Sequence, residues 1–128
     1  MAKEELLLRL SLLEQEGDQL EEQLKAVDKK IAELEIFKRE LSELKENKEK
    51  GILAHIGEGI FIEGEIKSKE VLVNIGNKIV IKKKIPEAQE IIEKQINRFK
   101  EIKKELIKQI EKINLELMRL VEEVDKKP

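Results

Sequence analysis

Two long stretches of the chain, 2–50 and 86–127, carry apolar residues at alternating steps of three and four. This spacing is typical of helices that pack along a partner helix in a coiled coil. The block between them, 51–85, holds five of the six glycines. The order helix, strands, helix predicts an α+β chain, in which a long antiparallel two-helix coiled-coil hairpin carries a small sheet at its base.

The first stretch places one apolar stripe along its helix, with Gly17 in the single skipped position. The stripe comprises Leu6, Leu10, Leu13, Leu20, Leu24, Val27, Ile31, Leu34 and Leu41. Strict spacing would then put Lys38 and Lys45 in the stripe, so we expect it to slide to Phe37 and Leu44. Gly51 is placed to end the helix as its C′ residue. Gly17 marks either a bend or a close approach of the partner helix.

The second stretch begins at Pro86, which suits the first turn of a helix. Its stripe comprises Ile92, Ile96, Phe99, Ile102, Leu106, Ile110, Ile113, Leu117, Leu120 and Val124. Here Ile102 is expected to replace Lys103, again by a slip of one residue.

The middle block changes to the period of two that is typical of strands. Four strands are predicted at 52–56, 60–66, 71–75 and 79–84, with Gly76-Asn77 in a type II′ turn and Gly57-Glu58-Gly59 in a second tight turn. Two small hairpins have unpaired edges and apolar residues on both faces, so we expect strands of neighbouring subunits to cover them. The predicted oligomerisation residues are Ile60, Phe61, Ile62, Ile66, Val71, Val73, Ile75, Ile79 and Ile81.

These residues resemble the alpha class of prefoldin. The similarity is carried by the run Ile52-Leu53-Ala54-His55-Ile56-Gly57-Glu58-Gly59-Ile60-Phe61-Ile62, by Val71-Leu72-Val73-Asn74-Ile75-Gly76, and by Pro86-Glu87-Ala88 at the start of a helix. His55, where the family often has proline, and Lys78, where a small residue is common, depart from the pattern. The resemblance extends over 1–128 as one prefoldin-like unit, with a helix at 1–50, the double hairpin at 51–85 and a second helix at 86–128.

The resemblance implies an ATP-independent molecular chaperone in the cytoplasm. Two alpha-type and four beta-type subunits would complete an inter-subunit β-barrel from which six coiled coils hang. The ends of the coiled coils would hold unfolded client proteins and deliver them to a group II chaperonin. Homologous alpha-like chains that form filaments imply an alternative, a structural protein that self-assembles into a filament or ring.

The two ends of the predicted hairpin that meet carry more apolar residues than a two-stranded seam needs. The expected client-binding tip comprises Leu6, Leu7, Leu8, Leu10, Leu12, Leu115, Met118 and Val121. We expect Leu7, Leu8, Leu12, Leu115, Met118 and Val121 to be its exposed members. Such a surface would bind unfolded chains without requiring a particular sequence. A wider stripe for helix packing or self-association is the competing explanation, and an adaptor with one folded client remains open.

Other functions find little support in the residues. With 26 basic and 28 acidic side chains mixed along the chain and no cysteine, nothing indicates a nucleic-acid surface, a disulfide framework or a thiolate metal site. His55, the single histidine, is expected to be a strand side chain. The run Lys82-Lys83-Lys84 is expected to discourage unwanted edge pairing. No apolar run is long enough for a membrane span, so we expect a soluble intracellular protein with no membrane partner. No serine or cysteine nucleophile is paired with a base, and the glycines near 57 and 59 lack the spacing of a phosphate loop, so we expect no enzyme activity and no cofactor.

Overall fold

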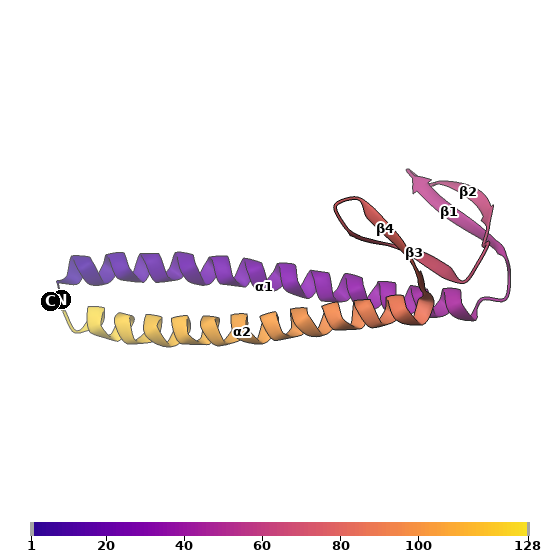
Figure 1. Ribbon diagram of the computed structural model, residues 1–128. Coiled ribbons are helices and arrows are strands. Elements are labelled where there is room, and N and C mark those ends of the chain that lie inside the picture. The colour runs from indigo at the N-terminus through magenta and orange to yellow at the C-terminus, as the bar shows by residue number, and fades with distance from the viewer. Residues whose placement is uncertain (1, 128) are drawn as a thin grey trace. The chain divides into compact units, whose positions relative to one another are not determined.

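The computed structural model describes residues 2–127 (Figure 1). Its elements follow the predicted order of helix, four strands and helix. They are α1 (Lys3–Glu46), β1 (Gly51–Gly57), β2 (Ile60–Glu65), β3 (Glu70–Gly76), β4 (Ile79–Lys84) and α2 (Ile85–Asp125). The chain divides into two compact units: a coiled-coil unit of residues 2–33 with 96–127, and a hairpin unit of Leu34–Gln95.

In the coiled-coil unit, α1 and α2 lie side by side and antiparallel, so the start of α1 is next to the end of α2 (Figure 1). Its core is built from the heptad positions of both helices. The buried cluster consists of Leu20, Leu106 and Ile113, with Leu13, Leu24, Val27, Ile110 and Leu117 half-buried against it. Packing of these two narrow stripes, rather than helix propensity alone, stabilises helices of this length.

The predicted slips at Phe37 and Ile102 are wrong. Phe37 is 49% exposed and Ile102 is 41% exposed, whereas Lys38 and Lys103 are partly buried at the positions that strict heptad spacing assigns to them. Each lysine can remain there because it reaches a carboxylate of the other helix. Lys103 Nζ lies 2.8 Å from Asp28 Oδ1 in the coiled-coil unit. Further along α1, Leu44 is half-buried and Lys45 exposed, as predicted.

In the hairpin unit, Lys38 Nζ lies 2.5 Å from Glu93 Oε2. The hydrogen bond and the charge of Glu93 raise the pKa of the Lys38 amine above its usual value. One turn further along α1, Gln89 Nε2 donates to Ser42 Oγ at 2.8 Å. Polar contacts therefore add to the apolar ones between the helices in this unit, which also holds the buried Leu34, Ile85 and Ala88.

Gly17 lies within a continuous helix and faces Ile113. A Cβ built on Gly17 would lie 3.5 Å from Ile113 Cγ2, which is an ordinary van der Waals contact. The close-approach interpretation therefore describes this position, and there is room for a methyl group.

We expect Gly17→Ala to stabilise the protein by about 1 kcal/mol, because alanine is the better helix former and its methyl group would fit against Ile113. Thermal or urea unfolding followed by circular dichroism measures the change. A less stable Gly17→Ala variant would show that the helices cannot accept a methyl group here.

The first helix ends earlier than predicted, at Glu46, and Gly51 is the first residue of β1 rather than a helix cap. The end of α1 is held instead by Lys69, from the segment that joins the two hairpins. Lys69 Nζ donates to the carbonyl oxygens of Leu44 at 2.8 Å and Asn47 at 2.6 Å. A cation at a helix C-terminus satisfies orphan carbonyls and the negative end of the dipole together.

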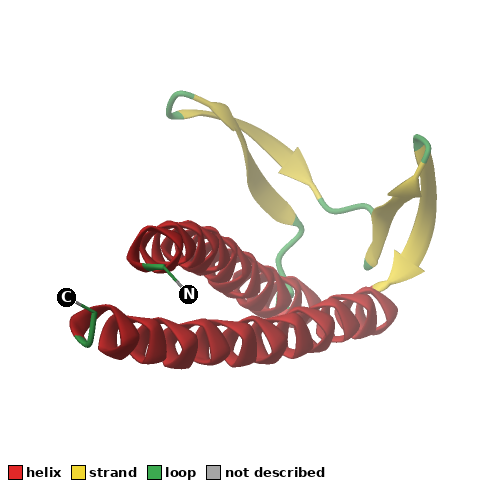
Figure 2. Ribbon diagram, turned by 90° about the vertical axis from the view of Figure 1, so that its left-hand side faces the viewer, coloured by secondary structure: helices red, strands yellow, loops and turns green. Residues whose placement is uncertain are grey.

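The four strands form two separate two-stranded antiparallel sheets, β1 with β2 and β3 with β4 (Figure 2). Both hairpins share one design. Each has an irregularity in register just before its turn, between His55 and Gly57 in one and between Asn74 and Gly76 in the other. Each turn has two residues with positive φ, at 51° and 76° for Glu58-Gly59 and at 49° and 61° for Asn77-Lys78.

The predicted type II′ turn at Gly76-Asn77 is therefore wrong. Gly76 pairs with Ile79, and the two connecting residues are Asn77 and Lys78, whose positive φ angles are those of a type I′ turn. Gly76 has a φ of 109° in the irregular step before the turn, which explains why a glycine stands there without being a central turn residue.

Candidate functional site: the coiled-coil tip and the exposed hairpins

The tip is the end of the coiled-coil unit where the first turns of α1 meet the last turns of α2. Leu6 is 0% exposed and Leu120 is 1% exposed, so the seam remains packed up to this end. Arg9 Nη2 lies 3.3 Å from Glu116 Oε1 across the helices, and the same oxygen lies 2.5 Å from Arg119 Nη2. The tip is therefore a closed pair of helices rather than a frayed end.

Around this packed seam the tip exposes apolar side chains. The six that are 47% to 68% exposed are Leu7, Leu8, Leu12, Leu115, Met118 and Val121. Leu8 and Leu12 are one turn apart on α1, and Leu115 and Met118 are one turn apart on α2, so each pair lies along one side of its helix. Their exposure agrees with what the heptad pattern predicts for residues outside the stripe.

Two of the predicted tip residues are buried or half-buried and so are less accessible to a client than the other six. Leu6 is fully buried because it occupies the heptad stripe against α2, so its assignment as a contact residue is wrong. Leu10, also a stripe residue, is half-buried. Both residues pack in the seam beneath the tip, and the exposed surface is formed by the six residues named above.

The hairpins form a second apolar surface, in the hairpin unit. Among the predicted oligomerisation residues, more than half of the surface is exposed at Ile60, Phe61, Ile62, Ile75 and Ile79. The remaining four, Ile66, Val71, Val73 and Ile81, are half-buried. Leu53, Ile56 and Leu72, which the prediction omitted, are 66%, 67% and 70% exposed.

Alternation along the strands divides the apolar residues between two faces of each sheet. On β2, Ile60 and Ile62 lie on one face and Phe61 on the other, where its ring is 5.0 Å from that of His55. His55 is thus a strand side chain in contact with Phe61, as predicted. A two-stranded sheet with apolar residues on both faces cannot cover itself.

Residues 2–127 contain no group of three or more histidine, cysteine or acidic side chains that could hold a metal ion. In the same described range, neither helix has a stretch apolar and long enough to span a bilayer. A hollow of about 730 Å³ beside the end of α1 is lined by 45–50 and 66–69, and its Lys69 already serves as the helix cap.

Two helices joined by two β-hairpins form the architecture that the resemblance implies, and comparison with known proteins decides the family. The family model described as "Prefoldin subunit" matches residues 13–127. The chain belongs to the prefoldin family. This match includes all four strands and most of both helices.

Two curated prefoldin relatives bear the name "Prefoldin subunit alpha". One, from Methanobrevibacter smithii, is 34% identical over 69% of this chain and 61% of its own length. The other, from Methanosphaera stadtmanae, is 26% identical over 70% of this chain and 64% of its own length. The matched segment thus spans about three fifths of these relatives. The predicted alpha-type resemblance is confirmed.

A solved structure shares the prefoldin fold. It is the cryo-EM structure of filamentous PFD from Methanocaldococcus jannaschii, and it superposes with a TM-score of 0.76 over 94% of this chain and 98% of its own. At 23% identity this similarity concerns the fold. It confirms the predicted fold class of a two-helix hairpin with two β-hairpins.

Proposed function

We propose that this chain is the alpha-type subunit of an ATP-independent prefoldin chaperone, which captures unfolded polypeptides at the coiled-coil tip. The observation that carries the proposal is the cluster of six exposed apolar side chains around a seam that is already closed by Leu6 and Leu120. These six residues lie outside the buried seam and keep about half or more of their surface exposed. Their exposure costs solubility, so a binding role explains them better than a structural one.

The tip is suited to partners of varied sequence. Apolar contact is nondirectional and contributes about 25 cal/mol per Å² buried, so it favours any unfolded chain with exposed apolar residues. Met118 adapts its shape to different partners. Among the charged groups at the tip, Arg9, Glu116 and Arg119 are paired with one another across and along the helices.

In this proposal the hairpins hold the subunit in an oligomer. The partners are beta-type prefoldin subunits, in a hexamer of two alpha and four beta chains, and a group II chaperonin receives the client. The exposed apolar residues of the two small sheets support a role in assembly. The proposed unit comprises 1–128, with client capture and assembly in different parts of the chain.

A second candidate is a structural role in which the chain assembles with itself into a filament or ring. The filamentous PFD structure, which has the same fold, favours it. The two functions share the hairpin contacts and differ in whether the tip binds unfolded chains.

The test is suppression of aggregation. A chemically unfolded client protein is diluted into buffer with this chain, alone or mixed with a beta-type subunit, and light scattering is recorded without ATP. The chaperone role predicts that scattering falls as the proportion of subunit rises. Unchanged scattering together with stable large assemblies would favour the structural role.

A further inference from the structure

The two β-hairpins are versions of one sequence pattern. At a constant spacing of 19 residues, the pattern Leu-x-x-Ile-Gly-x-x-Ile-x-Ile begins at Leu53 and again at Leu72. The strand registers match as well, since Leu53 pairs with Glu63 where Leu72 pairs with Lys82, and Gly57 pairs with Ile60 where Gly76 pairs with Ile79. Corresponding positions in the two hairpins therefore have the same place in the strand.

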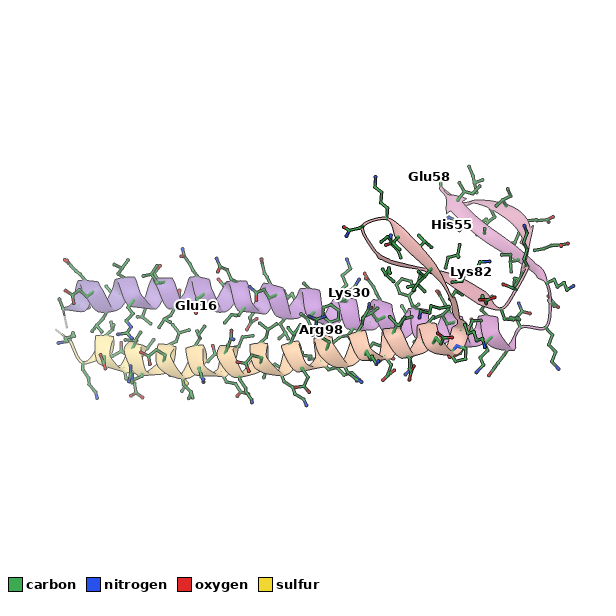
Figure 3. All side chains as sticks on the ribbon, viewed as in Figure 1. Glu16, Lys30, His55, Glu58, Lys82 and Arg98 are labelled. Atoms are coloured by element: carbon green, nitrogen blue, oxygen red, sulfur yellow. The ribbon has the colours of Figure 1, made fainter. Side chains whose placement is uncertain are left out.

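At corresponding positions the charges are opposite. The β1–β2 hairpin, 51–65, has three glutamates and no lysine or arginine, for a net charge of −3. The β3–β4 hairpin, 70–84, has four lysines and one glutamate, for a net charge of +3. Glu63 and Glu65 on β2 correspond to Lys82 and Lys84 on β4. Figure 3 shows Glu58 on the acidic hairpin and Lys82 on the basic one.

These four charged residues share a face with Leu53 on one hairpin and Leu72 on the other, and each leucine is about two thirds exposed. Within residues 2–127, none of the four forms an ion pair. The two hairpins also remain in separate sheets, so β2 and β4 each have an edge with no strand beside it in the described chain. The complementary charges are thus unused by the chain itself.

We infer that the acidic β1–β2 hairpin of one copy of this chain pairs edge to edge with the basic β3–β4 hairpin of a second copy. With their corresponding faces aligned, Glu63 and Glu65 would lie next to Lys82 and Lys84 of the neighbour. Opposite charges on adjacent strands stabilise pairing, and like charges oppose it. The inference rests on the assembly role proposed above for the hairpins and adds which hairpin binds which.

The charges would then determine which hairpins pair with each other as well as how tightly they pair. Acidic hairpins would repel acidic ones, and basic hairpins would repel basic ones, so contacts between two copies of the same hairpin are disfavoured. Because each copy carries both hairpins, two copies could pair reciprocally in a closed dimer. If each copy uses the contact once in each direction, the interface is heterologous and gives a filament, or a ring if it closes. The lysine run would therefore select a partner strand, whereas the sequence prediction assigned it the role of preventing pairing.

Charge reversal tests this pairing. The variants are Glu63→Lys with Glu65→Lys, Lys82→Glu with Lys84→Glu, and all four substitutions together. Size-exclusion chromatography with light scattering on the chain alone gives the association constant at low ionic strength. We expect each double variant to associate at least tenfold more weakly than the unchanged chain. An equimolar mixture of the two doubles, and the fourfold variant alone, should recover association, because both restore acidic-to-basic contacts.

Recovery in the mixture also shows that the double variants are folded, and circular dichroism checks their helix content. Failure of the mixture and the fourfold variant to recover would overturn the inference. So would a double variant that associates like the unchanged chain, or an unchanged chain that is monomeric until a beta-type subunit is added. No client is present in this experiment. A failure of client capture would therefore not affect the measured hairpin pairing, and a failure of hairpin pairing would not affect the test of client capture.

Discussion

Replacing Leu7, Leu8 and Met118 together by serine is expected to abolish the suppression of client aggregation. Each of these side chains is about half or more exposed, so the folded protein loses little when it is removed. A bound client would lose about 1 kcal/mol of apolar contact for each substitution. The total, about 3 kcal/mol, corresponds to roughly 100-fold weaker binding. Light scattering of the client during dilution measures the effect.

The matched control replaces Ile102 and Ile107 by serine. These residues lie on α2 in the same coiled-coil unit and are also exposed, at 41% and 37%, but they are outside the tip. Suppression should be retained in this control. Equal loss in both variants would mean that apolar surface anywhere on the helices is sufficient. The oligomeric mass of the tip variant should be unchanged.

The second large effect is expected in the core of the coiled-coil unit. Leu106→Ala removes a side chain that belongs to the buried cluster with Leu20 and Ile113. The lost contacts and the resulting cavity should lower the free energy of unfolding by about 3 kcal/mol. Urea unfolding followed by circular dichroism measures this change.

The neighbouring Ile107→Ala is the control for Leu106→Ala, because Ile107 is one residue along α2 and is exposed. Ile107 is 37% exposed and Leu106 is 7% exposed, so the cost at Ile107 should be clearly smaller, about 1 kcal/mol. If the two substitutions had equal effects, the strict heptad register on α2 would be incorrect.

The helices and strands could be predicted from the spacing of their apolar residues. This spacing is three to four residues in the helices and two residues in the strands. The errors arose where polar and apolar residues competed for one position. An apolar rule favours Phe37 over Lys38, and Ile102 over Lys103, but the structure keeps the lysines in register because Glu93 and Asp28 face them. A single helix does not reveal which carboxylate the partner helix presents. The register at these positions therefore depends on ion pairs between the helices, which the apolar pattern of one helix cannot predict.

The exposed members of the tip could be predicted for the same reason, since a residue outside the stripe faces solvent. Leu6 was assigned both to the heptad stripe and, with its leucine neighbours, to the tip surface, and its burial shows that the stripe position decides its environment. For the hairpins, the 19-residue repeat and its reversed charges were present in the sequence. Their meaning required the strand registers, which place Glu63 opposite Leu53 and Lys82 opposite Leu72.

The most direct test of the account is site-specific photo-crosslinking to an unfolded client. A photoreactive amino acid is placed at Leu115 in the tip, at Ile107 on the same helix, and at Leu53 on the acidic hairpin, all of which are exposed. The account predicts client adducts from position 115, none from 107, and adducts to a neighbouring subunit from 53. Client adducts from position 53 or 107 that equal or exceed those from 115 would contradict it.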